Sequence, residues 1–422
     1  MISSEIYYNR LQRKFRRKIN LNLSRIKFFL KKKKIDVNKI NGEFLQVVGS
    51  DGKNAVIQSL LAILIQNNKK ITTYTSPSVI SPLDRIFIKN KFISLKNFRK
   101  LGNYLIKSKA KLTLFEALTL IYILTIKNLK DINYHIVEAG AGFNKDSTNL
   151  WSSPKIQTIT NINKQHLDLF GVKTIKDICK IKVASLSHNT HIYIGKQDPK
   201  VMKIIKKILK KNPSKKTYYG KDFKIIKKNK SYIFKDKKGK LKLKANQIHS
   251  EGLWDGVALA VKITRDLGVN NKTILKALPK IRMRGRIEYI NKGKLRKYLN
   301  KSETLILDGA HSLKSGLNLR NYLLNIKQPL YGIFGIQKNR YPNIFIKQFK
   351  DVFKKIITLK IPNTPNSVSA KKLKEICKKN NIYSESASSV INAIKKISSK
   401  EKKTIVAFGS LYLISSFLKK NN

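Results

Sequence analysis

Residues 44–55 run Phe44-Leu45-Gln46-Val47-Val48-Gly49-Ser50-Asp51-Gly52-Lys53-Asn54-Ala55. An apolar run enters a turn with two glycines, and helical periodicity follows from Ala55 to Gln66. A strand, a glycine turn and a helix in this order are typical of a loop whose backbone N–H groups surround phosphate oxygens. Lys53 is then placed to reach the β- and γ-phosphates. An ordinary strand-to-helix turn with an exposed lysine is the alternative that these residues leave open.

This loop departs from the usual phosphate-loop pattern at two places. Ser or Thr usually follows the lysine and helps to bind Mg²⁺ through its hydroxyl, whereas Asn54 and Ala55 follow Lys53 here. Asp51 also adds a negative charge near a bound triphosphate. That charge is unfavourable unless the carboxylate faces elsewhere or meets a cation.

Outward from this stretch, short apolar strands alternate with helices. The first series has predicted strands at 71–74, 134–138, 156–162 and 191–194 and helices at 114–126 and 253–267. Residues 221–243 show period-two patches around a glycine turn, which predict a small antiparallel excursion. The second series has strands at 304–307, 330–334, 353–359 and 404–408 and helices at 313–324 and 390–397. The alternation predicts an α/β protein with a large, parallel-sheet ATP-binding domain (1–283) and a smaller Rossmann-like C-terminal domain (284–422).

The composition is strongly basic, with 89 Lys+Arg against 24 Asp+Glu and a formal net charge of +65. The excess is spread along the chain, and no zinc-finger or RNP-type motif accompanies it, so we expect no specific nucleic-acid partner. A uniform positive field still attracts anionic ligands such as nucleotides or polycarboxylates. The two cysteines, Cys179 and Cys377, lie far apart, which excludes a disulfide scaffold and a CxxC-type module.

No membrane segment is expected. The basic N-terminal residues have no apolar segment behind them. The longest apolar segment, 112–126, carries Glu116 and is shorter than the ~20 residues that span a bilayer. These features predict a cytoplasmic protein without a membrane partner.

Short motifs follow one another along the chain in the order of one known family. Asn20–Ile26 is similar to the family pattern DLxLxRI, Gly49–Ala55 to GTNGKGS, Tyr74–Ser78 to YTSPH, Thr113–Thr119 to TxFExxT, Glu138–Asn149 to EVGLGGRLDATN, Ile159–Asp168 to ITSIGLDHMD, Thr174–Lys182 to TLxxIAxEK, Gly285–Arg286 to GR, Asp308–Ser312 to DGAHN, and Gly409–Leu413 to GSLYL. Over nearly its whole length the chain therefore resembles the folylpolyglutamate synthase/dihydrofolate synthase family of the Mur ligase superfamily. The resemblance implies a Mur-ligase-like fold with a P-loop-type ATPase domain.

The resemblance also implies a reaction and its small molecules. A folate-type carboxylate, such as dihydropteroate or tetrahydrofolate, attacks the γ-phosphate of ATP, and L-glutamate then attacks the acyl phosphate. The implied cofactors are ATP and two Mg²⁺ ions, with a carbamylated lysine and no organic prosthetic group. The partners are the small-molecule substrates alone, and a monomer is expected.

Residue by residue, the resemblance assigns roles to matching positions. The implied ATP-binding residues are Gly49, Ser50, Asp51, Gly52, Lys53, Asn54, Ala55, Arg286, Asp308 and His311. The implied metal ligands are Ser76, Glu138, His166 and, once carbamylated, Lys182. The implied folate contacts are Thr113, Phe115, Asp146 and Ser147, and the implied catalytic residues are Lys53, Lys182 and His311.

Plainer interpretations of single residues stay open. Ser76 is also a common turn residue, His166 fits a helix start, and Lys182 alone fits a surface lysine. Phe115 on a helix fits a core position, and Asp308 with His311 fits a strand-to-helix turn with an Asp cap. Several family positions are also changed, namely Ala55, Ser78, Asn144, Gln165, Ile181, Ser312 and the loosely matched segment 246–250.

Three alternatives to a folate ligase remain. A Mur-type ligase could join an amino acid to another carboxylate, although the segments around Thr113 and Asp146 favour folate. A non-catalytic paralogue that binds nucleotide would explain Ala55 and Asn144. Binding of nucleic acid through bulk charge ranks last and predicts steep salt dependence without sequence preference.

Overall fold

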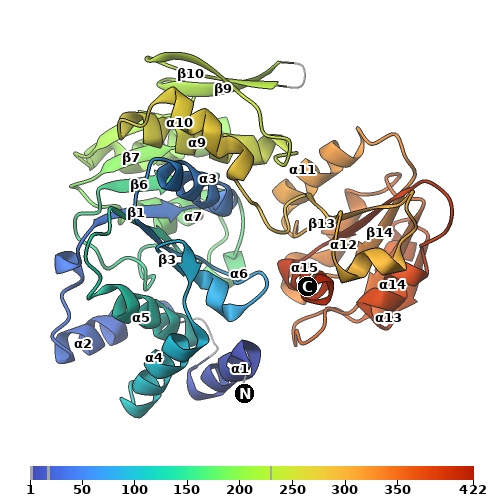
Figure 1. The fold of residues 1–422 in the computed structure, drawn as a ribbon, viewed down its shortest axis with the longest axis horizontal. Helices are drawn as coiled ribbons and strands as arrows, with labels where there is room; N and C mark the ends of the chain where they lie inside the picture. The colour runs from blue at the N-terminus through green and yellow to red at the C-terminus, as the bar shows by residue number, and fades with distance from the viewer. Residues whose placement is uncertain (1–2, 17–19, 229–230) are drawn as a thin grey trace. The chain divides into compact units, whose positions relative to one another are not determined.

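The structure is a computed structural model that describes residues 3–16, 20–228 and 231–422. The chain forms two compact units, each built around its own main sheet (Figure 1). Unit 1 comprises Met1–Asn246 and Leu253–Ile281, and unit 2 comprises Gln247–Gly252 and Arg282–Asn422. Within the described residues, no helix combines the length and apolar character that a membrane crossing requires.

The large sheet of unit 1 has the strand order β4-β3-β2-β5-β1-β6-β7-β8. Its strands are β1 (Glu43–Val48), β2 (Ile71–Tyr74), β3 (Ile86–Ile88), β4 (Lys91–Phe92), β5 (Tyr134–Glu138), β6 (Ile156–Ile159), β7 (His191–Ile194) and β8 (Lys215–Tyr218). The strands from β2 to β8 in this order run parallel, and β3 and β4 add an antiparallel edge. Because β5 and β6 flank β1, the segments that follow Val48, Glu138 and Ile159 meet at one edge of the sheet, where ligands bind in such folds.

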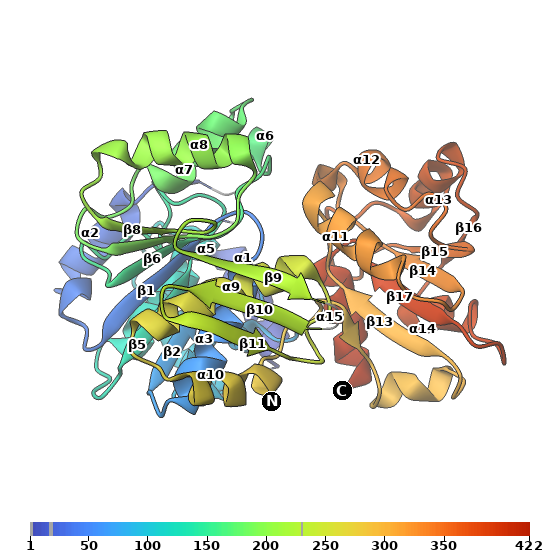
Figure 2. The same ribbon diagram turned by 90° about the horizontal axis from the view of Figure 1, so that it is seen from above.

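Helices cover both faces of this sheet. They are α1 (Ser4–Lys14), α2 (Ser24–Lys32), α3 (Lys53–Gln66), α4 (Leu95–Lys107), α5 (Leu114–Ile126), α6 (Leu167–Phe170), α7 (Ile175–Val183), α8 (Pro199–Ile208), α9 (Glu251–Asp266) and α10 (Asn271–Ala277). Figure 2 shows α7 and α8 on one face and α3, α9 and α10 on the other. Phe44 and Val48 are four positions apart along β1 and therefore face the same side of the sheet. Phe44 belongs to the core cluster that includes α5, and Val48 belongs to the cluster that includes α7 and α8.

A smaller antiparallel sheet joins β9 (Phe223–Lys228), β10 (Ser231–Asp236) and β11 (Gly239–Leu243). An ion cluster with α9 anchors it. The fully buried carboxylate of Asp236 accepts from Arg265 Nη1 at 2.6 Å and from Lys262 Nζ at 3.5 Å. Charges are buried in proteins only when they are paired in this way.

Unit 2 is built on a sheet with the order β12-β13-β17-β14-β15-β16. Its strands are β12 (Glu288–Tyr289), β13 (Thr304–Asp308), β14 (Leu330–Phe334), β15 (Lys355–Leu359), β16 (Ser384–Ala387) and β17 (Thr404–Phe408). Its helices are α11 (Leu313–Leu323), α12 (Pro342–Lys347), α13 (Ala370–Lys379), α14 (Val390–Lys395) and α15 (Leu411–Asn421). Strand β12 pairs antiparallel and the others parallel, and the core contains an aromatic group around Phe408.

The predicted fold class is confirmed, including the parallel sheets and the antiparallel excursion at 221–243. Several predicted bounds differ from the structure. The strand predicted over 156–162 ends at Ile159, because residues from Thr160 onward leave the sheet and turn toward the loop after β1. The strand predicted over 353–359 begins at Lys355, after a turn at Asp351 and Val352. The roles predicted for the two domains, 1–283 and 284–422, stay predictions.

Candidate active site

The loop between β1 and α3 needs glycine at both of its turning points. Gly49 has φ +151°, and a Cβ there would lie 2.0 Å from Thr160 Oγ1. Gly52 has φ +89° and directly precedes α3. The first N–H groups of a helix have no carbonyl partner one turn earlier, so they can bind an anion. This geometry favours the phosphate-loop interpretation over an ordinary turn.

Lys53, Glu138 and Ser76 come together beside this loop from three separate elements. Lys53 Nζ donates to the carbonyls of Gly49 at 3.2 Å and Ser50 at 3.4 Å, and it lies 3.8 Å from Glu138 Oε1. The other oxygen of Glu138 accepts from the backbone N–H of Ser76 at 2.8 Å. A cation and a carboxylate therefore stand next to the N-terminus of α3.

The carboxylate of Asp51 faces amide groups. Asp51 Oδ2 accepts from Asn163 Nδ2 at 2.8 Å and from Gln165 Nε2 at 3.0 Å. The next residue, His166, has a left-handed backbone (φ 61°) and precedes the short helix α6, but its side chain makes no capping hydrogen bond. Its ring packs edge-on against Phe170 at 6.3 Å between centroids. The chain thus places His166 next to the segment that contacts the phosphate loop.

Lys182 is a buried residue of α7 with 1% of its surface exposed, so it is not a surface lysine. Its Nζ donates to the carbonyls of Ala141 at 2.6 Å and Gly49 at 3.1 Å. Burial lowers the pKa of Lys182 to about 7, and the neighbouring charge of Lys53 contributes to this shift, while Asp146 opposes it. A large share of this amine is neutral near pH 7, as a lysine nucleophile requires.

The four predicted folate residues lie around the start of α5 and the loop after β5. Thr113 caps α5 and forms a capping box with Glu116, whose carboxylate accepts from Arg25 of α2 at 2.8 Å. Ser147 Oγ and Thr119 Oγ1 are 2.7 Å apart. Asp146 is fully buried, which raises the pKa of its carboxyl, and Thr148 donates twice to its Oδ1.

Phe115 and Asp146 both lie close to Gly140, on the side where a Cβ would stand. A Cβ on Gly140 would lie 2.4 Å from Asp146 Oδ2 and 3.0 Å from the Phe115 ring. Glycine at this position therefore leaves room for both side chains against the backbone after β5.

The remaining predicted residues form a second group in unit 2, at the end of β13. Asp308 is buried and accepts from the N–H groups of Ala310 at 2.7 Å and Ile287 at 2.9 Å. Burial raises the pKa of Asp308, and the adjacent charge of Arg286 opposes this. His311 Nδ1 lies 2.7 Å from the carbonyl of Gly309. Ser312, not Asp308, caps α11, so the capping explanation of Asp308 does not apply.

Two of the changed family positions have structural explanations. Ala55 is buried where α9 crosses α3, and a Cβ built on Gly256 would lie 2.6 Å from the Ala55 Cβ. His249 of the loosely matched segment packs between the rings of Tyr289 and Tyr322 at 4.9 and 5.6 Å, and burial lowers its pKa. Ala55 and His249 are thus both held by packing contacts.

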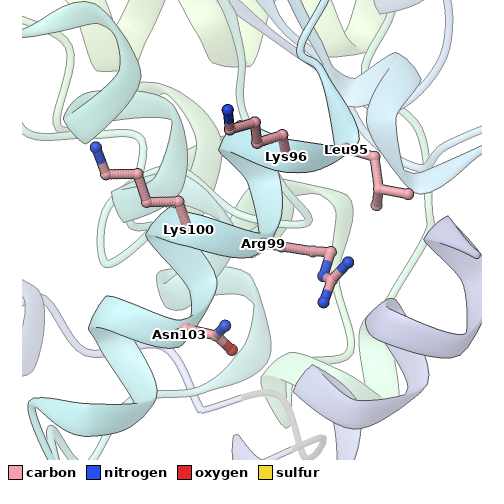
Figure 3. A pocket seen from close by; sticks show the side chains of 5 residues that line it. All are labelled: Leu95, Lys96, Arg99, Lys100 and Asn103. Carbon is pink, nitrogen blue, oxygen red and sulfur yellow. The ribbon is translucent and has the colours of Figure 1, made fainter. Parts of the chain in front are cut away.

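A pocket outside these groups lies on α4 and is lined by Leu95, Lys96, Arg99, Lys100 and Asn103 (Figure 3). In Figure 3 the side chains of Leu95 and Arg99 point to one side of the helix and those of Lys96 and Lys100 to the other. None of the predicted site residues lines it.

Sequence reasoning missed two partners of the site. In the sequence Gln165 stands out only as a departure from a motif, yet its side-chain amide donates to Asp51, 114 positions away in the chain. The signal was the unexplained charge of Asp51 itself, which required a partner. Arg25 was part of a matched motif, but its contact with Glu116 becomes visible only in the fold.

Comparison with known proteins gives concordant matches along the chain. The family model described as the Mur ligase middle domain matches residues 47–253, and the model described as the dihydrofolate synthetase C-terminal domain matches residues 291–420. The dihydrofolate synthase/folylpolyglutamate synthase of Buchnera aphidicola subsp. Schizaphis graminum is 27% identical, over 96% of this chain and 94% of the relative. The dihydrofolate synthetase of Saccharomyces cerevisiae is 23% identical, over 96% and 98% of the two chains.

Solved structures show the same fold. E. coli FolC in complex with DHPP and ADP superimposes with a TM-score of 0.84 at 19% identity, over 99% of this chain and 97% of that chain. The bifunctional folylpolyglutamate synthase/dihydrofolate synthase of Yersinia pestis, complexed with AMPPNP and Mn, also gives 0.84 at 19% identity, over 98% and 97%.

Proposed function

Because this chain belongs to the folylpolyglutamate synthase/dihydrofolate synthase family of the Mur ligases, we propose that it uses ATP to join L-glutamate to a folate-type carboxylate. The acceptor is dihydropteroate, tetrahydrofolate or both. Its carboxylate attacks the γ-phosphorus of ATP and releases ADP. The amine of L-glutamate then attacks the acyl carbon and displaces phosphate, which leaves an amide.

One observation carries this proposal: Lys53 lies between the phosphate-loop carbonyls and Glu138 at the N-terminus of α3. The helix N-terminus attracts phosphate oxygens, and the ammonium of Lys53 neutralises charge as phosphoryl transfer proceeds. The side chain of Lys53 is 15% exposed, so a ligand can reach it. The solved structures of similar fold contain ADP or AMPPNP, which supports a nucleotide as a ligand of this chain.

The residues near Lys53 fit Mg²⁺ held together with a nucleotide. Among the described residues, no group of three His, Cys, Asp or Glu side chains forms a metal cluster. Mg²⁺ in nucleotide sites typically uses one or two carboxylates, phosphate oxygens and water, which matches Glu138 with the hydroxyl of Ser76. When bound, Mg²⁺ neutralises charge on the phosphates. His166 is an unusual ligand for this hard cation, so only the family pattern supports it.

Lys182 is the candidate for carbamylation. Its pKa of about 7 leaves a neutral amine whose lone pair can attack CO₂, forming an N–C bond with loss of one proton. The product is a carboxylate on a buried side chain beside Gly49. Such a group supplies the oxygen ligand for a second ion, in line with the two ions that the family pattern implies.

Other predicted residues serve the remaining substrates. Thr113, Phe115, Asp146 and Ser147 contact the folate ring system in this proposal. The unit 2 group of Arg286, Asp308 and His311 contacts ATP, since a guanidinium beside a backbone turn can bind phosphate oxygens. Asp308 holds the turn after β13 through Ala310, so it fixes the backbone at this group.

The proposal is tested by incubating the protein with ATP, Mg²⁺, L-glutamate and either dihydropteroate or tetrahydrofolate, and measuring acceptor mass. We expect one glutamate residue to be added to the acceptor, only when ATP is present. Lys53→Ala abolishes this addition with circular dichroism unchanged, whereas Lys107→Ala, an exposed lysine on α4, retains it. An unmodified acceptor with the folded wild-type protein would contradict the proposal.

A further inference from the structure

The segment that follows β6 is hydrogen-bonded to the phosphate loop. The backbone N–H groups of Ser50 and Asp51 both donate to the carbonyl of Asn161, at 2.8 and 3.2 Å. Ser50 Oγ donates to the carbonyl of Asn163 at 3.2 Å and accepts from the N–H of Asn163 at 3.2 Å. The first half of the loop is therefore fixed to this segment, and the N–H groups at the start of α3 remain for phosphate.

The carboxylate of Asp51 completes this attachment. A carboxylate only accepts hydrogen bonds, and the amides of Asn163 and Gln165 supply donors to its Oδ2 at 2.8 and 3.0 Å. Hydrogen bonds to an ionised acceptor are among the stronger ones in proteins. We call Asp51 with these two amides the Asp51 bracket.

The Asp51 bracket also offsets the repulsion that the Asp51 carboxylate would exert on a bound triphosphate. A carboxylate near a triphosphate is repelled by it, and two fixed amide donors stabilise the charge while directing its Oδ2 toward residues 163–165. Gln165 precedes His166, so the same segment links the loop to a proposed metal ligand. Relative to the motifs quoted above, the acid and the amide have exchanged places: Asp51 stands at the Asn of GTNGKGS, and Gln165 at the Asp before the His.

We propose that Asn163 and Gln165 are positioning residues for the nucleotide: they hold Asp51, and through it the phosphate loop, in the conformation that binds ATP. This inference rests on the proposed function for its kinetic readout. The effect on nucleotide affinity can be tested independently of the proposed function, because affinity is measurable without turnover.

The experiment exchanges the acid at position 51 and the amide at position 165, and each substitution keeps the shape of the side chain. Gln165→Glu places a second carboxylate against Asp51 and removes a hydrogen-bond donor. We therefore expect KM for ATP and Kd for Mg-AMPPNP to rise by about tenfold or more, which is the effect of losing a hydrogen bond to a charged group. In the double variant Asp51→Asn/Gln165→Glu, the amide introduced at position 51 donates to the carboxylate introduced at position 165, so most of the loss is recovered. Rescue by the second change distinguishes positioning from general damage.

Gln328→Glu in unit 2 is the matched control, because it adds the same charge and still accepts from Thr404 Oγ1. It leaves both constants at the wild-type value. A double variant no better than Gln165→Glu, or a Gln165→Glu variant with wild-type Kd, would overturn the inference. So would a wild-type protein that binds no nucleotide. Nucleotide binding with this pattern but no glutamate addition would instead count against the proposed function alone.

Discussion

Lys182 makes the stability of unit 1 depend on pH, and Lys182→Met should remove that dependence. Burial lowers the pKa of Lys182 to about 7 from 10.5. Between these two pH values the unfolded chain binds a proton that the folded chain does not, so the free energy of unfolding increases as pH rises toward 10.5. Below pH 7 the amine is protonated in both states, and the full cost of burying its charge lowers the stability of the fold. From pH 7 to pH 9 the two pKa values predict a gain of about 2 kcal/mol in the free energy of unfolding.

Urea unfolding at pH 7, 8 and 9 in CO₂-free buffer, in which Lys182 stays an unmodified amine, measures this gain when it is followed by tryptophan fluorescence. Both tryptophans, Trp151 and Trp254, belong to unit 1. The wild type should gain about 2 kcal/mol more than Lys182→Met over this range. Lys107→Met removes an exposed amine and should follow the wild type. Parallel pH dependence in wild type and Lys182→Met would refute the reasoning, because it would mean that the amine is solvated.

Three further substitutions test the site. Glu138→Gln keeps an acceptor for Ser76 N–H but loses the charge, so kcat for glutamate addition should fall by about 100-fold or more with an unchanged melting temperature. Gly49→Ala forces a Cβ against Thr160 and strains the loop, so it should destabilise unit 1 by about 2 kcal/mol or more in urea and weaken Mg-AMPPNP binding. Arg25→Ala leaves Glu116 buried without its ion pair and should cost about 2 kcal/mol, with KM raised for the acceptor but not for ATP.

Sequence periodicity predicts the helices and strands that are buried on one face or on all sides. The strand 71–74 and the helix 114–126 were predicted with the bounds that the structure shows. Helix α1 was not predicted, because only Tyr7 and Leu11 of its residues are buried and the rest are mostly charged or polar. Two apolar positions are too few to establish a helical period.

The candidate site also has some features that local sequence predicts and others that only the fold reveals. Local pattern located the glycine turn between β1 and α3, because the strand, the two glycines and the helix start lie within a few residues of one another. The role of this turn as a phosphate loop stays a prediction. Lys182 looked like one lysine among many, and only the packing of α7 against the sheet makes it buried. The partners of Asp51 could not be found from local sequence, since the turn of the chain after β6 brings them back to the loop.

The most direct test of the account is ADP release with Mg-ATP and L-glutamate, compared among dihydropteroate, tetrahydrofolate and no acceptor. The account predicts release that requires an acceptor, and the acceptor that supports it shows which step the protein catalyses. Equal release without acceptor, or no release from folded protein that binds ATP, would contradict the account and favour another carboxylate substrate or a binding-only paralogue.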